Sequence, residues 1–375
     1  MLRALILWSL SSALLQGADY YVAPTGDDGN VGSMAKPFAS IKRAQESVKP
    51  GDTVYLRGGT YVMKEEQIMA RERNRAIVIH LYKSGLQGKP IRYLAYQQEK
   101  PVFDFTQVKP ANMRVHAVRA SGSWLHLTGF TTVGVQVTIT GHTQSINVEN
   151  TGSNNVFEQL IMCDGQGIGF WLGRGSNNLI LHCDAYNNHD DTSENKRGGN
   201  VDGFGFHVPS GSINNVFRGC RAWYNSDDGF DSISTSESHR LENCWAFYNG
   251  TNQKGERLGD GNGFKVGGYA STPADRLPRT IPRHVVIGCI AAMNRASGFY
   301  SNHQIGGIDF LGNSSFRNSR NYNMLGRSAD HTGDVPGYGH VIKNNVSFGS
   351  RHDLDNVDRA RCEISNNSFD LKIPL

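Results

Sequence analysis

A periodic arrangement of cysteine, phenylalanine and asparagine constrains the fold of this chain more than any other feature of its sequence. One segment recurs as HCDAYNN (182–188), GCRAWYN (219–225), NCWAFYN (243–249) and GCIAAMN (288–294), and GNSSFRN (312–318) keeps its form with Asn313 in place of cysteine. A glycine–phenylalanine pair also recurs, ending at Phe170, Phe204, Phe230, Phe264 and Phe299. Short strands that alternate with Asn/Gly turns at such a period are typical of a solenoid.

The repeat predicts an all-β fold, a right-handed parallel β-helix, because each coil of such a solenoid buries the same position at the same place. We expect the five phenylalanines to stack as one ladder. A second ladder of buried thiols is expected from Cys163, Cys183, Cys220, Cys244 and Cys289. In a third ladder, side-chain amides of successive coils should be joined by hydrogen bonds. Its members are Asn188, Asn225, Asn249, Asn294 and Asn318. Buried cysteine acts here as a small hydrophobic residue, so no disulfides are expected.

Residues 1–18 have the pattern of a secretory signal peptide, because Arg3 precedes an apolar stretch and small residues stand near its end. No later stretch is apolar enough to cross a bilayer. We therefore expect a secreted or periplasmic protein with no membrane partner. A single parallel β-helix catalytic domain is predicted over residues 19–375. A short helix near residues 40–48, with Ser40 as its N-cap, should cap the open end of the solenoid.

The overall charge restricts the partners only loosely. A net charge of +4 is too mild to predict a nucleic-acid partner, and it suits an enzyme that meets a polyanion. A capped solenoid leaves no obvious strand edge for pairing, so a monomer is expected.

The phenylalanine ladder fixes which side chains point outward. Successive side chains on a strand face opposite ways, so the residue after each phenylalanine should be outside: Trp171, Gly205, Asp231, Lys265 and Tyr300. The residues two positions before each phenylalanine are assigned to the same outer face: Ile168, Asp202, Asp228, Asn262 and Ser297. Asp227 is expected in the turn before the strand. Because neighbouring coils lie about 4.8 Å apart, this register gathers four aspartates and Lys265 in one place.

Two longer loops flank the coil that carries DDGFD (227–231). They should wall a groove whose floor is the acidic cluster, and their basic side chains could line it: Lys196, Arg197, Lys254 and Arg257. Several converging carboxylates form an oxygen-only site, which favours Ca²⁺ over Mg²⁺ or Mn²⁺. A bound cation and an enclosed groove would both lower the pKa of Lys265, and a neutral amine can act as a general base.

A calcium site beside a basic lysine predicts β-elimination on a uronate polymer. The C5 proton of a uronic acid is alpha to a carboxylate and becomes more acidic when a cation neutralises that charge. Removal of this proton by the amine breaks the C4–O bond and leaves an unsaturated sugar.

Three motifs, in this order, resemble the family-nine polysaccharide lyases: GGNVDGF (198–204), NSDDGFD (225–231) and GNGFKVGG (261–268). The N-terminal YYVAPTGDDGN (20–30) shares the resemblance, which therefore covers most of the chain. The resemblance implies a secreted, calcium-dependent parallel β-helix enzyme that acts on pectic polymers. It also implies four calcium ligands, Asp202, Asp227, Asp228 and Asp231, and Lys265 as the Brønsted base.

The segment GFYSNHQ (298–304) departs from the pectate-cleaving members, which tend to carry Asp-Gln-Asn-Asn after the phenylalanine. The substrate is therefore left open between pectate (polygalacturonate) and a rhamnogalacturonan backbone. Tyr300 and Trp171 could stack on a sugar ring, and arginines could bind a second carboxylate. The candidate substrate-binding residues are Arg295, Tyr300, Asn302, Arg197 and Arg240.

Two other classes remain as alternatives. A polygalacturonase-type hydrolase also carries adjacent aspartates, but the expected Gly-His-Gly is missing, since Gly-His at 141–142 and at 339–340 is not followed by glycine. A non-catalytic sugar-binding β-helix with structural calcium would have no need of Lys265.

Overall fold

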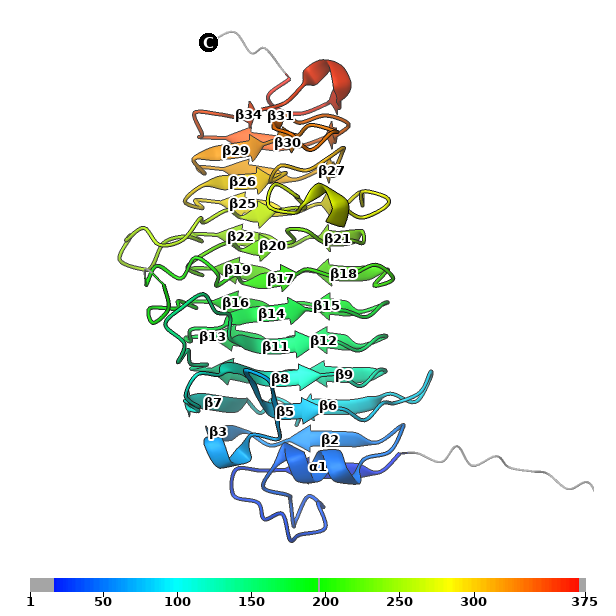
Figure 1. The fold of residues 1–375 in the computed structure, drawn as a ribbon. Helices are drawn as coiled ribbons and strands as arrows, with labels where there is room; N and C mark the ends of the chain where they lie inside the picture. Colours follow the sequence, from blue (N-terminus) through cyan, green and yellow to red (C-terminus); the bar gives the residue numbers. More distant parts are fainter. Residues whose placement is uncertain (1–16, 195, 371–375) are drawn as a thin grey trace, which may run out of the picture.

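The computed structural model describes residues 17–194 and 196–370, which wind into a parallel β-helix (Figure 1). Each coil contributes in turn one strand to each of three long sheets. The predicted signal peptide lies almost entirely outside the described residues. In the part that the structure describes, no helix is long and apolar enough to cross a membrane.

The first sheet has 12 strands. They are β1 (Asp19–Val22), β2 (Thr53–Leu56), β6 (Ile91–Ala95), β9 (Leu125–Thr128), β12 (Val156–Glu158), β15 (Leu179–Leu181), β18 (Asn215–Arg218), β21 (His239–Glu242), β24 (Val285–Ile287), β27 (Asp309–Leu311), β32 (Val341–Lys343) and β35 (Glu363–Ser365). The second sheet has 10 strands. They are β3 (Gly59–Lys64), β7 (Pro101–Gln107), β10 (Thr131–Val133), β13 (Ile161–Cys163), β16 (Asp184–Tyr186), β19 (Arg221–Trp223), β22 (Trp245–Phe247), β25 (Ile290–Ala292), β28 (Ser314–Phe316) and β33 (Val346–Phe348).

The third sheet has 11 strands and carries the candidate site. They are β4 (Ala70–Glu72), β5 (Arg75–Leu81), β8 (Arg114–Ala120), β11 (Ile146–Asn150), β14 (Ile168–Leu172), β17 (Phe204–Phe206), β20 (Phe230–Asp231), β23 (Phe264–Lys265), β26 (Ser297–Tyr300), β29 (Arg320–Asn323) and β34 (Leu354–Asp355). A separate hairpin pairs β30 (Leu325–Arg327) with β31 (Asp334–Pro336). The short 3₁₀ turns are η1 (Glu65–Gln67), η2 (Ala274–Arg276) and η3 (Arg359–Arg361).

The phenylalanine ladder is confirmed and holds the third sheet against the core. The five phenylalanines are register partners on adjacent strands, and Tyr322 extends the row. The rings of Phe204 and Phe230 stack with centroids 4.8 Å apart, and those of Phe264 and Phe299 with centroids 5.0 Å apart. Because every ring is buried, any coil that slipped by one residue would expose its ring to water.

The asparagine ladder is also confirmed. The Nδ2 of Asn225 donates to Asn249 Oδ1 at 3.2 Å, and that of Asn249 donates to Asn294 Oδ1 at 3.0 Å. Asn188 and Asn318 continue the row at its two ends. Each buried amide in the row is therefore satisfied by the next coil, which fixes the stacking at the turns.

The thiol ladder holds for four of the five predicted cysteines, which are buried directly before β16, β19, β22 and β25. Cys163 was assigned wrongly: it ends β13 and is the register partner of Tyr186, so Leu160 takes its place in the row. The sequence repeat does not show that Cys163 is displaced by three positions from the row that contains Cys183. The strand pairing of β13 with β16 does show it. All six cysteines are free.

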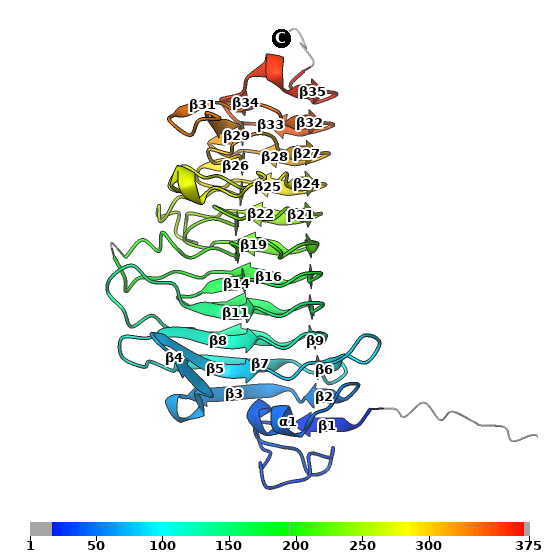
Figure 2. The ribbon, with the colours of Figure 1, turned by 45° about the vertical axis from the view of Figure 1, so that its right-hand side comes forward.

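The predicted N-terminal cap is present as helix α1 (Ile41–Ser47), and Figures 1 and 2 show it at the end of the coil stack. Ser40 is its N-cap, and its side chain accepts a hydrogen bond from the backbone N–H of Arg43. Ile41 and Ala44 belong to the hydrophobic core. The helix therefore closes the end of the core that the first coil would leave open.

Candidate active site

Four outward positions of the third sheet line up across adjacent strands. Gly205 on β17 is the register partner of Asp231 on β20. Asp231 is also the register partner of Lys265 on β23, and Lys265 is the register partner of Tyr300 on β26. The predicted register is confirmed. The strand spacing of about 4.8 Å thus places side chains that are distant in sequence next to one another.

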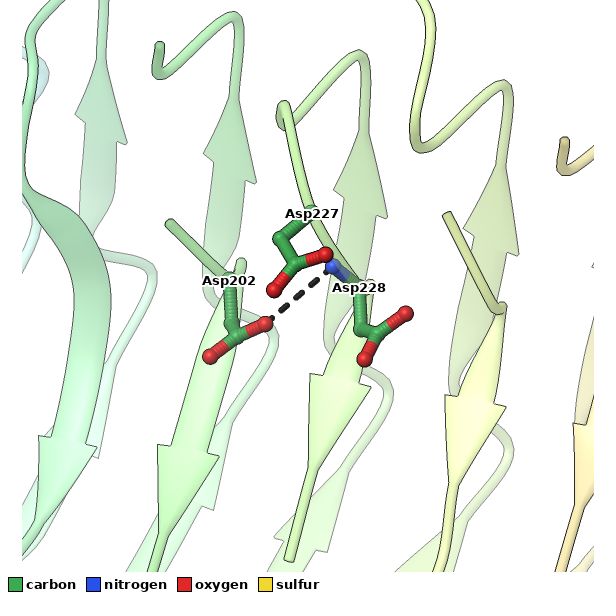
Figure 3. A group of neighbouring side chains, drawn as sticks. All are labelled: Asp202, Asp227 and Asp228. Atoms are coloured by element: carbon green, nitrogen blue, oxygen red, sulfur yellow. Dashed lines mark hydrogen bonds between the residues drawn. The ribbon is translucent and has the colours of Figure 1, made fainter. Parts of the chain in front are cut away.

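Three aspartates form a compact, buried cluster beside this row (Figure 3). One carboxylate oxygen each from Asp202, Asp227 and Asp228 lies within 4.8 Å of the others. Their relative exposures are 3%, 4% and 0%, respectively. The backbone N–H of Asp228 donates to Asp202 Oδ1 at 3.1 Å, which ties neighbouring coils together.

The assignment of the residues two before each phenylalanine to the outer face is wrong for Ile168 and Ser297, and all five residues are buried. Because β17, β20 and β23 begin at the phenylalanine itself, Asp202, Asp228 and Asn262 lie in the turns before these strands. Strand alternation does not apply there. Ile168 and Ser297 lie within strands and are buried as alternation requires. Asp227 lies before its strand, as expected.

Lys265 connects the aspartate cluster to the outward row. Its Nζ lies 3.0 Å from Asp228 Oδ2 and 3.3 Å from Asp231 Oδ2. Its side chain is only 12% exposed. Burial acts to lower the pKa of Lys265, but the surrounding carboxylates, Asp228 first, outweigh it and raise the pKa above the ordinary value. The expected lowered pKa is therefore not produced by the protein side chains alone.

The charges of the cluster suit a cation. Burial first, and then the neighbouring carboxylates, raise the pKa of Asp202 and of Asp227 well above the ordinary value. Burial also raises the pKa of Asp228, against the opposing charge of Lys265. Carboxylates held together in this way repel one another, and a bound cation relieves the repulsion. An oxygen-only donor set is the kind that hard cations such as Ca²⁺ prefer.

Asp231 lies beside the group of three rather than within it. Its Oδ2 faces Lys265, and its Oδ1 accepts a hydrogen bond from the backbone N–H of Ile233 at 2.9 Å. His207 is a neighbour that the sequence reasoning missed, with its Nε2 4.0 Å from Asp231 Oδ1. Alternation along β17 from Gly205 would have indicated that His207 faces outward.

The two insertions form loops that project from the solenoid, one between β16 and β17 and one between β22 and β23 (Figures 1 and 2). The second loop is fastened to the aspartate cluster, because Asp227 Oδ1 accepts a hydrogen bond from the backbone N–H of Asp260 at 2.6 Å. Arg295 Nη1 donates to the carbonyls of Gly259 at 2.5 Å and of Asp260 at 3.1 Å. The guanidinium of Arg295 thus holds this loop. The four basic residues expected to line the groove are exposed in the two loops.

The remaining candidates for substrate binding have different positions. Tyr300 lies beside Lys265, and its hydroxyl is 3.1 Å from His303 Nε2, while His303 Nδ1 is 2.8 Å from Asp334 Oδ1. Burial, as the largest cause, raises the pKa of Tyr300 to about 12. Asp334 was not found from the sequence, because it lies on the separate hairpin, outside the repeat.

Asn302 and Arg240 do not join the site. Asn302 is buried and donates to the carbonyl of Gly267 at 3.0 Å, so its amide serves the turn. Arg240 lies on β21 of the first sheet and pairs with Glu242 at 2.8 Å. Arg197 is exposed in the first loop. The sequence repeat predicts which coil contains Arg240, but it does not predict which of the three sheets that residue belongs to.

Comparison with known proteins agrees with this architecture. Residues 20–352 match the family described as "Pel9A-like, right handed beta helix region". The chain is 33% identical over 352 residues to pectate lyase L of Dickeya chrysanthemi, covering 93% of this chain and 75% of that protein. It is 31% identical over 331 residues to pectate lyase PEL9 of Emericella nidulans, covering 80% of this chain and 74% of that protein.

Two solved structures are similar along nearly the whole chain. A rhamnogalacturonan lyase matches with a TM-score of 0.92 and 47% identity, covering 96% of this chain and 89% of that one. Pectate lyase Pel9A matches with a TM-score of 0.73 and 30% identity, covering 94% and 80%, respectively. The resemblance seen in the sequence and the predicted right-handed β-helix are confirmed, and the hydrolase and non-catalytic alternatives are not retained. The chain belongs to the Pel9A-like right-handed β-helix family and is a polysaccharide lyase.

Proposed function

We propose that the chain cleaves a galacturonate-containing pectic polymer by β-elimination, with Lys265 as the base and with Ca²⁺ held by Asp202, Asp227, Asp228 and Asp231. One observation carries the proposal: the amine of Lys265 lies 3.0 Å from the buried aspartate cluster and on an outward row of the third sheet. The names of the similar proteins support a pectic substrate.

The reaction needs a base at C5 of a uronate and a way to offset the charge of its carboxylate. Bound Ca²⁺ would supply that offset and acidify the C5 proton. In the neutral form, Lys265 Nζ takes the C5 proton, the bonding pair forms the C4–C5 double bond, and the C4–O bond breaks toward the leaving sugar. Asp228 and Asp231 fix the direction of the lysine side chain. Tyr300, the next residue in the row, lies where it would meet the sugar bound at Lys265.

Two polymers fit this chemistry, because both contain galacturonate. Pectate is supported by the pectate lyases that are 31% and 33% identical to the chain. A rhamnogalacturonan backbone is the second candidate, and the specific observation in its favour is the 47% identity to a rhamnogalacturonan lyase. We also propose export, supported by the pattern of residues 1–18, and a monomeric single-domain protein, supported by the capped solenoid.

The test is the ultraviolet absorbance of the unsaturated product, measured in parallel on polygalacturonate and on rhamnogalacturonan, each with calcium and with a chelator. A calcium-dependent rise on one polymer is expected and identifies the substrate. Reducing ends that appear without absorbance would contradict elimination. An equal rise in the presence of chelator would contradict the role of the cation.

A further inference from the structure

A cavity lies on the third sheet, apart from the aspartate cluster. Its volume is about 340 Å³, and its lining includes Arg75, Glu149, Trp171 and Arg174. Glu149 and Trp171 are register partners on β11 and β14, and Trp171 is in turn partnered by Gly205. The cavity therefore continues the outward row that leads through Asp231 to Lys265.

The indole of Trp171 leans toward the candidate active site. A Cβ added at Gly205 would lie 2.6 Å from Trp171 Cε3 and 2.7 Å from Cζ3, so the six-membered ring occupies the space above the glycine. The ring is also packed against His207, with centroids 4.6 Å apart. Trp171 is half-buried, so part of the indole remains available to a ligand. The absent side chain at Gly205 is what permits this position.

The charges around the cavity favour an anionic ligand. Glu149 Oε2 is held by Arg119 Nε at 2.5 Å and lies 2.7 Å from His116 Nδ1. Burial acts in the opposite direction, but these contacts lower the pKa of Glu149 to about 2, so Glu149 is ionised at neutral pH. Its cationic partner Arg119 also pairs with Glu72 at 2.7 Å. Arg75 and Arg174 are exposed, and neither forms an ion pair with a residue that the structure describes. Two arginines that form no ion pair with a described residue thus line the same cavity as Trp171.

We propose that this cavity is a second sugar-binding subsite, in which Trp171 stacks on a pyranose ring and Arg174, with Arg75, binds the carboxylate of a uronate residue. The inference rests on the proposed function, since the ligand is another unit of the polymer that Lys265 attacks. The strands β14 and β23 are three strand spacings apart, roughly 14 Å, which allows several sugar units between the two points. The polymer then lies along the solenoid axis, across Gly205.

Binding of polymer to the inactive Lys265→Ala variant, in the presence of calcium, tests the subsite without turnover. Affinity electrophoresis would compare polygalacturonate, rhamnogalacturonan and methyl-esterified polygalacturonate. Adding Trp171→Ala should weaken binding about fivefold on charged and esterified polymer alike, as the loss of one stacking contact predicts. Adding Arg174→Gln should weaken binding about fivefold only where carboxylates are free. Gly205→Ala keeps the indole but displaces it, and should act like Trp171→Ala.

Trp245→Ala and Arg221→Gln are matched controls, because both residues are exposed on the second sheet, away from the row. Site variants that bind within about twofold of these controls would overturn the subsite. An equal loss for Arg174→Gln on esterified polymer would overturn its role as a carboxylate ligand. If the wild type eliminates no uronate polymer but these losses appear, the proposed reaction fails and the subsite stands. Normal elimination with unchanged binding overturns the subsite alone.

Discussion

Lys265 and Asp228 come from neighbouring coils, 37 positions apart in sequence, yet Nζ of one lies 3.0 Å from Oδ2 of the other. The contact arises because Asp231 and Lys265 are register partners, which brings the turn that carries Asp228 beside the lysine. The pair is nearly dry, so each charge depends on the other. A bound cation would compete with Lys265 for the aspartates and release the amine for proton transfer.

Lys265→Ala should lower kcat by about 10²–10⁴-fold, the usual contribution of a general base. Calcium binding should persist, because the proposed ligands remain. Product absorbance measures the loss, and circular dichroism with calcium present checks the fold. Lys89→Ala is the matched control, since Lys89 is exposed in a turn far along the chain from the site. A rate for Lys265→Ala close to that of the control would contradict the assignment of the base.

Asp228→Asn should weaken calcium binding by at least about tenfold, because it removes one charge from the cluster while keeping the size of the side chain. Its Oδ1 can still accept the hydrogen bonds from Asn262, which are 2.6 and 2.9 Å long, so the turn is preserved. Isothermal titration with calcium measures the change. Asp184→Asn removes a carboxylate that pairs with Arg221 on the second sheet and should leave calcium affinity unchanged.

Asp202→Asn should raise the melting temperature of the chelator-treated protein at pH 7. The pKa of Asp202 is raised in the folded state, so the folded state binds more protons than the unfolded state. Its ionisation therefore costs stability as pH rises from about 4 toward the folded-state pKa. The gain from Asp202→Asn should vanish below about pH 3, where the carboxyl is protonated in both the folded and the unfolded state. Thermal melts of Asp202→Asn and of the wild type, recorded at a series of pH values up to 7, measure the difference in melting temperature.

The same variant gives the opposite result when calcium is present. A cation that needs the Asp202 carboxylate stabilises the wild type by mass action and stabilises Asp202→Asn less. The melting temperature of the variant in saturating calcium should therefore be the lower of the two. A variant that is more stable with and without calcium would show that Asp202 does not contribute to a metal site.

The rate should rise from neutral to alkaline pH. The carboxylates raise the pKa of Lys265, so the neutral amine is scarce at neutral pH. While the pH stays below the pKa that Lys265 has with calcium bound, kcat/KM should increase by up to about tenfold per pH unit. Initial rates from pH 7 to 10 at saturating calcium measure the slope. A maximum in the acid range would indicate a carboxylate as the catalytic group.

The sequence alone determined the parts of this protein that repeat. The Phe230–Phe264 and Asn225–Asn249 pairs recur at corresponding positions in each coil, so one register predicts the fold and places Asp231 beside Lys265. The physical reason is that a solenoid relates each residue mainly to the same position one coil away.

Only the tertiary structure decided what departs from the repeat. Cys163 lies outside the thiol row because its strand is offset, and Arg240 lies on another sheet. The position of Trp171 above Gly205 depends on a side-chain direction that register does not specify. The pKa of Lys265 is raised because the attraction of several carboxylates outweighs the effect of burial. Both effects depend on distances between atoms. Such quantities arise from three-dimensional packing between coils and loops, and no periodic pattern in the sequence records them.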